Sequence, residues 1–324
     1  MLNLDSNELC VVFGVNGQDG SYIAESLVAQ NRNVIGVGRQ SSSKYLPISK
    51  FFSYRQLDIA DTQKVILFLN ETSPSTIFHA AAIHGASGFK YEDKWLEAHA
   101  VNTLSVHAVL EYLRLFGAGN LVYFSSSKAF GNDSSGNFSE NTRRESSCIY
   151  SITKNSASDL ISYYRSTHNV CSSTLWTFNH ESPRRGPEYF IPKIVACLSN
   201  VIEDSSYQAE VFSLNFCADW SDARELMGIA IKVSDARLHE DFVLASGETT
   251  LARHLVRDLF MSFGLDYKNH IIETGVINQL QQNWTADVEK LDVMLGCRAQ
   301  ISIFETCLQI LYKNYGHRST ETLS

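Results

Sequence analysis

The chain has 324 residues, 44% of them hydrophobic, and its formal net charge at pH 7 is -8. This length allows one large or two moderate domains, and the negative charge argues against a general nucleic-acid-binding protein. The start is polar and acidic and no apolar run is as long as a membrane span, so we expect neither a signal peptide nor a membrane helix. The seven cysteines form no C-x-x-C pair and no residue set has metal-ligand spacing, which predicts a cytoplasmic protein with reduced thiols and no metal.

The first recognisable unit is a strand, a glycine-rich turn and a helix. Residues 9–13 form a short apolar run, the turn contains Gly14, Gly17 and Gly20, and residues 21–30 have helical spacing. Glycines let the backbone approach a pyrophosphate, and the N-terminus of the following helix offers free N–H groups. The unit therefore predicts dinucleotide binding. Further candidate cofactor contacts in this turn are Asn16, Gln18 and Asp19.

The residues after the second expected strand, 33–38, indicate which dinucleotide is bound. NAD-binding folds often place an acid there to hold the ribose 2′-hydroxyl. This sequence has Arg39 instead, followed by Ser41 and Ser42. An arginine and hydroxyl groups suit a 2′-phosphate, which favours NADP (NADPH) over NAD; a solvated surface loop is the alternative.

Strands and helices alternate through the first half of the chain. Further strands are expected over 54–59, 75–82, 121–124 and 173–178, with helices over 62–70, 94–115 and 150–168. This rhythm predicts an α/β fold, a Rossmann-type doubly wound parallel sheet. Asp58 and Ile59 could flank the adenine, and the small residues Ala80, Ala81 and Ala82 would let the backbone approach the cofactor.

The pattern changes after residue 178, where prolines cluster and the apolar segments become shorter and mixed. We therefore expect an NADP-binding Rossmann domain over 1–178. A smaller, mixed α/β substrate-binding part is expected over 179–324, with some interleaving of segments between the two.

Tyr150 and Lys154 are four residues apart, so on a helix they share one face. A tyrosine hydroxyl, with a pKa of about 10, is a poor base at neutral pH, and a neighbouring ammonium would lower that pKa. Ser126 follows an expected strand, at the carboxyl edge where ligands of doubly wound sheets collect. These three residues form a candidate catalytic set.

Several stretches resemble the extended short-chain dehydrogenase/reductase superfamily and, within it, the GDP-mannose 4,6-dehydratases. They are GVNGQDGSYIAE (14–25), GRQSSS (38–43), Tyr150 to Lys154, FNHESPRRG (178–186), Asp219-Trp220 and ASGETT (245–250). The resemblance implies that Tyr150 is the acid/base, that Lys154 binds the nicotinamide ribose and that Asn102 bends a helix.

The resemblance also implies binding partners. It favours a nucleotide-sugar substrate, a GDP-sugar in particular, and a homodimer or homotetramer formed through the helices led by Asp93 and Tyr150. Candidate cofactor contacts in the FNHESPRRG stretch are Phe178, His180 and Arg185. Candidate substrate contacts are His84, Ser126, Asn179 and Lys193.

The sequence departs from the dehydratase pattern at the elimination step. Ser126 falls where the dehydratases carry a catalytic threonine, but Lys128 falls where they carry the glutamate that removes the C5 proton. An ammonium has no lone pair to accept a proton and has the opposite charge to a carboxylate. A diphosphate-binding arginine is replaced by Ala218, and another nucleotide-binding stretch aligns only loosely, with residues 274–278.

Three functions remain open at this stage. We favour a reductase or epimerase acting on a keto- or deoxy-sugar nucleotide, because hydride transfer needs only the cofactor, Ser126, Tyr150 and Lys154. The alternatives are a GDP-mannose 4,6-dehydratase and a noncatalytic NADP-binding regulatory protein. The sugar, the base of the nucleotide and the direction of reaction are left open.

Overall fold

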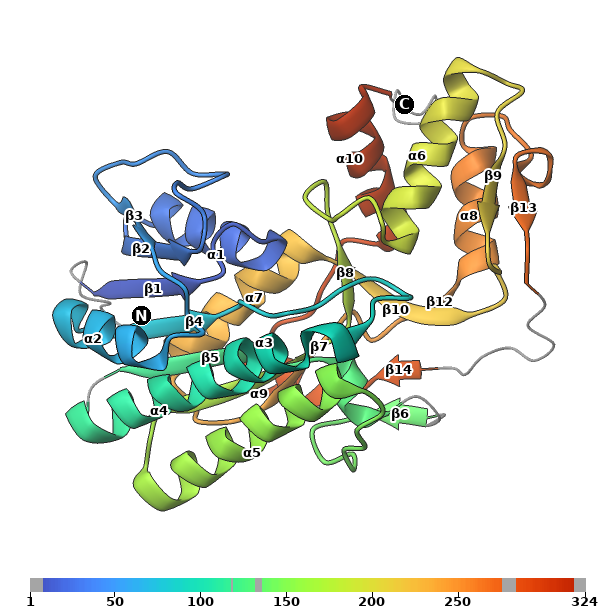
Figure 1. Cartoon of the computed structure of the whole chain (residues 1–324). Coiled ribbons are helices and arrows are strands. Elements are labelled where there is room, and N and C mark those ends of the chain that lie inside the picture. The colour runs from blue at the N-terminus through green and yellow to red at the C-terminus, as the bar shows by residue number, and fades with distance from the viewer. Residues whose placement is uncertain (1–7, 118, 132–135, 276–283, 318–324) are drawn as a thin grey trace.

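A computed structural model describes residues 8–117, 119–131, 136–275 and 284–317 (Figure 1). It confirms the α/β prediction: a seven-stranded parallel sheet has the order β11-β7-β5-β4-β1-β2-β3. The chain builds outward from β1 in one direction and then, from β4, in the other. Ligands of doubly wound sheets bind at this reversal point. The strands are β1 (Leu9–Phe13), β2 (Asn33–Gly38), β3 (Phe52–Gln56), β4 (Thr76–His79), β5 (Asn120–Phe124), β7 (Ser172–Thr177) and β11 (Phe242–Leu244).

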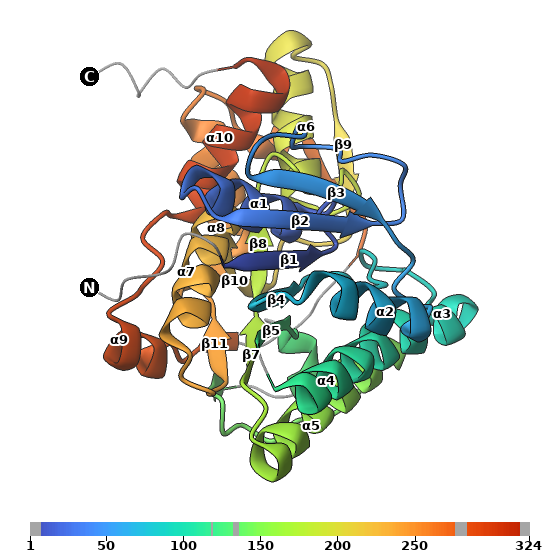
Figure 2. The ribbon, with the colours of Figure 1, turned by 90° about the vertical axis from the view of Figure 1, so that its left-hand side faces the viewer.

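Helices cover both faces of this sheet (Figure 2). One face packs against α1 (Gln18–Ala29) and α7 (Ala223–Ala236), and the other against α2 (Thr62–Thr72), α4 (Ser105–Phe116) and α5 (Ile149–His168). Successive strand residues point to opposite faces, so Phe78 and Val122 belong to the first core, and Ile77 and Leu121 to the second. Because both faces are buried, the central strand β1 is a continuous apolar run, LCVVF.

A second part of the chain packs beside the carboxyl ends of these strands. Its core lies among α6 (Phe190–Glu203), α8 (Ala252–Met261) and α10 (Ile303–Tyr315), and includes Leu198 and Trp220. Two small sheets complete it: β12 (Thr249–Leu251), β10 (Cys217–Asp222) and β8 (Asn179–Glu181) form one, and β13 (Ile271–Glu273) and β9 (Ala209–Val211) the other. Figure 1 shows this part at the upper right, above the large sheet.

The chain passes between the two parts more than once. After α6, β9 and β10 of the second part, the chain returns to the large sheet. There α7 packs on one face, and β11 pairs with β7. Near the C-terminus, Leu291 of α9 (Glu289–Leu295) joins the same core. The two parts are therefore tied together by several crossings rather than by one linker.

The structure corrects several predicted boundaries. β3 begins two residues earlier than expected because Phe52 is buried at its start. β4 ends at His79 instead of Ala82, since both backbone groups of Ile83 bond to the side chain of Asn102, at 2.8 and 3.2 Å. The predicted helix over 94–115 is divided into α3 (Trp95–His99), a π-helical turn (Ala100–Leu104) that contains Asn102, and α4. Between β5 and α5, where no strand is predicted, the chain forms β6 (Gly136–Phe138), which pairs with β14 (Trp284–Ala286).

Three general features bear on the class of protein. In the described ranges no helix is both long and apolar enough to cross a membrane. All seven cysteines are free thiols. Within the same ranges, no group of three or more His, Cys, Asp and Glu side chains could hold a metal ion.

Candidate active site

The glycine-rich turn between β1 and α1 is closely fitted to its surroundings. Gly14 has a φ of +85°, and a Cβ added there would lie 2.8 Å from the backbone of Ala81. A Cβ on Gly20 would lie 2.4 Å from the carbonyl oxygen of Gly14. The N-cap of α1 is Gly17, which has no side chain to occupy the first-turn N–H groups. The turn therefore fits a pyrophosphate at the helix N-terminus.

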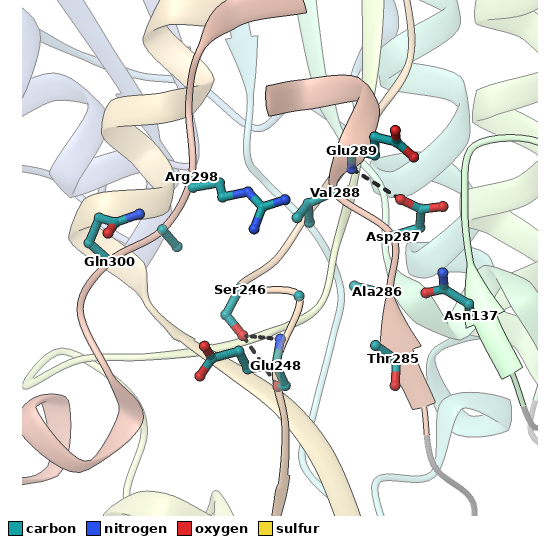
Figure 3. A pocket seen from close by; sticks show the side chains of 12 residues that line it. Asn137, Ser246, Glu248, Thr285, Ala286, Asp287, Val288, Glu289, Arg298 and Gln300 are labelled. Atoms are coloured by element: carbon teal, nitrogen blue, oxygen red, sulfur yellow. Dashed lines mark hydrogen bonds between the residues drawn. The ribbon is translucent and has the colours of Figure 1, made fainter. Parts of the chain in front are cut away.

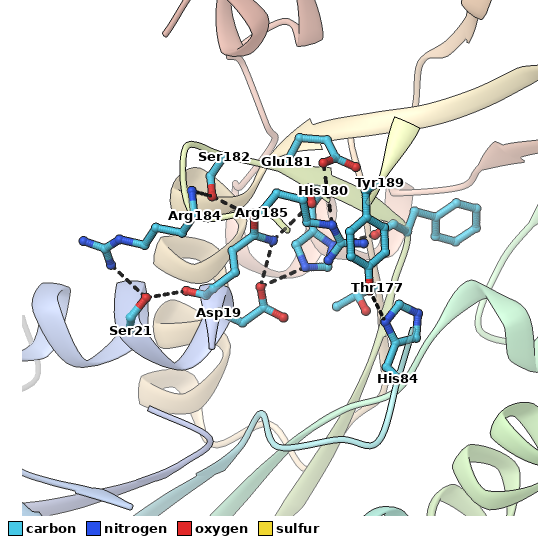
Figure 4. A network of polar contacts seen from close by, with 12 residues as sticks. Asp19, Ser21, His84, Thr177, His180, Glu181, Ser182, Arg184, Arg185 and Tyr189 are labelled. Atoms are coloured by element: carbon cyan, nitrogen blue, oxygen red, sulfur yellow. Dashed lines mark hydrogen bonds and ion pairs between the residues drawn. The ribbon is translucent and has the colours of Figure 1, made fainter. Parts of the chain in front are cut away.

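Residues 179–186, the NHESPRRG stretch, bind directly to the start of α1 (Figure 4). The Gln18 side chain donates to the carbonyl oxygen of His180 at 3.1 Å and accepts from the hydroxyl of Ser182 at 2.7 Å. His180 Nε2 lies 2.9 Å from Asp19 Oδ1. This stretch thus fixes the first turn of α1 from a position 160 residues later in the chain.

Arg184 adds a second attachment to the same helix. Its guanidinium donates to the Ser21 hydroxyl at 2.8 Å and forms an ion pair with Glu25. It also stacks between the rings of Tyr22 and Tyr45, at 4.2 and 4.4 Å from their centroids. The motif arginine therefore holds the two parts of the chain together.

The charged groups next to this attachment shift one another's pKa values. Burial alone would raise the pKa of Asp19, but the charge and hydrogen bond of His180 outweigh it and lower that pKa to about 2. Asp19 in turn raises the pKa of His180 against the effect of burial. Burial raises the pKa of Glu181 to about 7, although Arg185 lies 3.6 Å away. The Asp19 and His180 charges therefore stabilise each other.

Arg39 lies just beyond β2, as expected for a group that binds a 2′-phosphate. Its guanidinium is 57% exposed and forms a 2.7 Å ion pair with Glu97 of α3. The Asn16 amide donates to the carbonyl oxygen of Ser42 at 3.0 Å, which holds the serine loop against the glycine turn. Ser41 and Ser42 are exposed.

The predicted adenine and backbone contacts lie along the same edge. Asp58 is exposed, and its carboxylate accepts from the backbone N–H of Ala60 at 3.0 Å, whereas Ile59 is buried. After β4, the chain remains partly accessible at Ala80 and Ala81 and is exposed at Ala82.

The structure brings Ser126, Tyr150 and Lys154 together at the carboxyl edge of the sheet. Ser126 follows β5 and hydrogen-bonds to Tyr150, in the first turn of α5. Lys154 Nζ donates to the carbonyl oxygen of Phe124 at 2.7 Å and lies 5.7 Å from the centre of the Tyr150 ring. A carbonyl or hydroxyl oxygen placed at Ser126 and Tyr150 would meet two hydroxyl groups.

One prediction about this set is wrong. We expected Lys154 to lower the pKa of Tyr150, but burial raises it, and the opposing hydrogen bond from Ser126 does not compensate. Burial also lowers the pKa of Lys154 to about 7, and the negative charge of Asp19 opposes this only in part. Desolvation outweighs the tyrosine–lysine interaction here. Tyr150 therefore carries its proton at neutral pH.

Lys128 lies two residues beyond Ser126, on the 3₁₀ turn Ser127–Phe130. Its side chain is exposed, and its backbone N–H donates to the Ser126 hydroxyl at 3.2 Å. The structure thus places a lysine, not an acid, next to the catalytic set.

Comparison with known proteins identifies the family. The model of a family described as GDP-mannose 4,6 dehydratase matches residues 11–295. The chain belongs to the GDP-mannose 4,6 dehydratase family. This confirms the resemblance inferred from the sequence, and makes the protein a sugar-nucleotide-modifying enzyme of the extended short-chain dehydrogenase/reductase superfamily.

Individual relatives are similar at modest identity. A GDP-mannose 4,6-dehydratase from Yersinia enterocolitica is 26% identical over 311 residues, which cover 88% of this chain and 81% of the relative. The human GDP-mannose 4,6 dehydratase is 28% identical over 277 residues, covering 79% and 72%.

Solved structures match the fold. A dTDP-glucose 4,6-dehydratase from Bacillus anthracis in complex with NAD has a TM-score of 0.80 at 17% identity, covering 95% of this chain and 97% of that one. A UDP-glucose 4-epimerase from Thermotoga maritima with UDP-glucose has a TM-score of 0.80 at 18% identity, covering 98% and 100%.

The remaining predicted residues are the candidate substrate contacts. Asn179 is exposed at the start of β8. The Phe178 side chain packs in a hydrophobic cluster, its backbone N–H donates to the carbonyl oxygen of Leu244 at 3.1 Å, and its own carbonyl oxygen lies 2.6 Å from His180 Nδ1. Lys193 of α6 lines a cavity of about 200 Å³ that Tyr207 and Ile271 also border. Ala218 is buried in the neighbouring core. Of the loosely aligned residues 274–278, those from 276 on lie outside the described residues.

A larger hollow of about 540 Å³ lies elsewhere, between β14, α9 and the β11–β12 turn (Figure 3). Arg298, Glu248 and Asp287 border it. Its lining shares no residue with the Ser126, Tyr150 and Lys154 set, so size alone does not locate the chemistry in this family member.

Sequence reasoning missed two residues around Tyr150 and one in the NHESPRRG stretch. The ring of Tyr91 stacks on Tyr150 at 5.5 Å, and Tyr189 stacks on His84, which itself lies 4.8 Å from Tyr150. Glu181 is a buried carboxyl beside Arg185. Only the NHESPRRG stretch, which contains Glu181, gave any signal; the tyrosines lie in segments without a motif.

Proposed function

We propose that this protein is an NADP-dependent enzyme that transfers a hydride and a proton at one ring carbon of a nucleotide sugar, as a reductase or epimerase does. The observation that carries the proposal is the meeting of Ser126 and Tyr150 at the carboxyl edge of β5, with Lys154 one helical turn away. Both hydroxyl groups can contact one substrate oxygen there.

The properties of Tyr150 support reduction in particular. Its raised pKa keeps the proton on the hydroxyl, so Tyr150 can give that proton to a carbonyl oxygen as it becomes an alcohol. Ser126 holds the same oxygen. The nicotinamide ring of the bound cofactor would supply the hydride. The ammonium of Lys154, buried beneath the site, would contact the ribose hydroxyls of the cofactor.

The closely fitted glycine turn supports a dinucleotide cofactor, and Arg39 supports NADP. The guanidinium is accessible, and Ser41 and Ser42, which follow in the chain, are exposed. When a 2′-phosphate binds, the ion pair between Arg39 and Glu97 must break, or the guanidinium must contact both groups at once. The structural neighbours named above include one in complex with NAD, so cofactor choice is a property to measure for this protein.

The second part of the chain supplies the substrate side of the proposal. We propose that residues 1–178 bind the cofactor and that 179–324 hold the nucleotide sugar, except where α7 and β11 return to the large sheet. Lys193, Asn179 and His84 would contact the substrate, and the cavity beside Lys193 can take its nucleotide end. The named relatives act on GDP-mannose, which supports a GDP-sugar.

Assembly and location complete the proposal. Apolar side chains are exposed along α3 and α5, among them Trp95, Leu96, Ile152 and Tyr163. This face supports a homodimer or a homotetramer built from such dimers. The free thiols support a cytoplasmic location.

A second candidate is a GDP-mannose 4,6-dehydratase. The comparisons favour it over a reductase or epimerase, because the matching family and the named relatives carry that activity in their names. The site favours the first candidate, because Lys128 takes the place of the dehydratase glutamate. The third possibility, a noncatalytic NADP-binding protein, would retain the cofactor site alone.

NADPH oxidation tests the proposal directly. We expect the protein to consume NADPH when supplied with GDP-4-keto-6-deoxymannose, giving a sugar nucleotide heavier by two hydrogens. NADPH binding without consumption would contradict the proposal and support the regulatory alternative.

A further inference from the structure

His84 lies between two tyrosines at the catalytic edge. Its Nδ1 is 2.9 Å from the hydroxyl of Tyr189, whose ring lies 5.9 Å away and nearly parallel, at 8°. On its other side, the Tyr150 ring is 4.8 Å away. Figure 4 shows Tyr189 pointing toward His84 from the segment that carries His180 and Arg185. Tyr189 thus holds the imidazole in place beside Tyr150, and Tyr150 is the proposed acid.

The second nitrogen of His84 is available to a ligand. His84 follows β4, at the sheet edge where substrates collect, and its side chain is exposed there. Within the described residues, Nε2 makes no hydrogen bond. A substrate held by Tyr150 would therefore lie next to this nitrogen.

The charges around His84 keep the imidazole neutral. The outer part of the His84 side chain is exposed, but the protein atoms packed against the rest of it lower its pKa. The positive charges of Arg185 and Lys154 lower this pKa further. His180 also lowers that pKa, and Asp19 alone opposes. The remaining titratable neighbours are Tyr150 and Tyr189, whose pKa values are raised, so both stay protonated.

We propose that His84 is a further catalytic residue, a neutral donor whose Nε2–H binds an oxygen of the nucleotide sugar next to the one held by Tyr150. Tyr189 is its positioning residue: the hydroxyl donates to Nδ1 and so keeps the imidazole proton on Nε2. This inference rests on the proposed function, because it needs a sugar nucleotide at Tyr150.

The chemistry favours a donor over a base. A protonated tyrosine hydroxyl can donate to Nδ1, and a neutral imidazole has one N–H, which must then lie on Nε2. A neutral imidazole can polarise a carbonyl or stabilise a developing alkoxide without being repelled by nearby cations. Arg185, stacked 3.6 Å from the Tyr189 ring centre, helps keep that ring in place.

The first test is a spectroscopic one on the intact protein. Histidine labelled with ¹⁵N would be followed by long-range ¹H–¹⁵N correlation from about pH 5.5 to about pH 8.5, bracketing the usual histidine pKa of about 6.5. His84→Gln assigns the signal. We expect the Nε2–H tautomer throughout, with no protonation step in this range, and a mixture of tautomers in Tyr189→Phe.

Tyr163→Phe is the matched control, since it removes a tyrosine hydroxyl from the exposed face of α5 and should leave the His84 signal unchanged. The Nδ1–H tautomer in the wild type, or an ordinary titration near the usual pKa, would overturn the proposal. This result is independent of any turnover, so it stands even if the proposed function fails.

The second test is kinetic, with NADPH and GDP-4-keto-6-deoxymannose. His84→Leu should lower kcat by about 10²-fold, the usual effect of removing one donor to a transition state, and leave NADPH binding unchanged. His84→Gln, which keeps a neutral N–H donor, should recover about tenfold of that loss. Tyr189→Phe should lower kcat less than His84→Leu. Equal kcat values in the wild type and His84→Leu would refute the assignment, whereas no turnover in any variant refutes the proposed function instead.

Discussion

The glycine turn and the surroundings of Lys128 lie at the same edge of one sheet, yet they constrain their residues very differently. At the turn, a Cβ on Gly20 would lie 2.4 Å from a carbonyl oxygen. The adjoining Gln18 side chain forms hydrogen bonds with residues of the 179–186 stretch. Lys128, by contrast, is an exposed side chain on a short turn. Packing therefore dictates the cofactor side of the site, while the substrate side is free to change chemistry without disturbing the fold.

Replacing Tyr150, which hydrogen-bonds to Ser126, should have the largest effect. Tyr150→Phe keeps the ring packing against His84 and Tyr91 but removes the proton, so kcat should fall by about 10²–10⁴-fold, the usual effect of losing an acid or base. NADPH titration is the control and should be unaffected. Turnover close to that of the wild type would show that another group supplies the proton.

The constraint on the turn can be measured by adding one methyl group. Gly20→Ala should destabilise the protein by about 3 kcal/mol or abolish dinucleotide binding, because the backbone of Gly14 blocks the Cβ. Denaturant unfolding and NADPH titration would detect it. The matched control is Gly228→Ala in α7, where no atom lies within 4 Å and helix propensity should add about 0.5–1 kcal/mol of stability. Similar effects of the two substitutions would show that packing does not constrain the turn more than the helix.

A smaller effect is expected at the exposed end of the cofactor groove. Arg39→Ala should weaken NADP binding by about tenfold or somewhat more, the usual value of a charged hydrogen bond, and leave NAD binding nearly unchanged. Arg55→Ala is the control, because Arg55 is also exposed and paired with a glutamate, at 2.8 Å, but lies on β3. Calorimetric titration of both cofactors measures the ratio. NAD bound as tightly as NADP by the wild type would refute the assignment of NADP.

The smallest effect concerns the ion pair beneath the turn. Asp19 has a lowered pKa, so its stabilisation is present above the unfolded value and disappears as the pH falls toward about 2. His180 has a raised pKa, so its stabilisation is present at low pH and disappears as the pH rises through that pKa. The pair should stabilise the fold by about 1 kcal/mol between these limits.

Denaturant unfolding of the wild type and Asp19→Asn measures that contribution. The difference in unfolding free energy between the two should be larger below the His180 pKa, where the imidazole is charged, than above it. The charge of Asp19 also raises the pKa of Glu181 and of Lys154, so the same comparison in a His180→Gln background separates the His180 contribution from theirs. A difference independent of pH would show that His180 is not charged in the folded protein.

The same contrast explains what could be predicted from the sequence. The parallel strands, the glycine turn and the tyrosine–lysine pair depend on spacing within short segments, which hydrophobic periodicity and motif spacing report. The pairs His84–Tyr189 and Asp19–His180 are 105 and 161 residues apart, and no local pattern indicates such contacts. The return of β11 to the large sheet was missed for the same reason.

The sign of the Tyr150 pKa shift shows another limit. Sequence spacing placed Lys154 beside Tyr150 correctly, but the shift depends on how deeply both groups are buried, and both are almost fully buried. Burial is a property of the whole fold, so desolvation could not be weighed against charge in advance.

Mass spectrometry of GDP-mannose incubated with the wild-type protein and NADP is the most direct test of the central claim, that hydride chemistry is kept while elimination is lost. Loss of water across C5 and C6 needs a base, and we propose that Lys128 does not act as one. The account predicts no product lighter by one water from the wild type, and slow appearance of that product with Lys128→Glu. A product lighter by one water from the wild type would contradict the account and support a GDP-mannose 4,6-dehydratase.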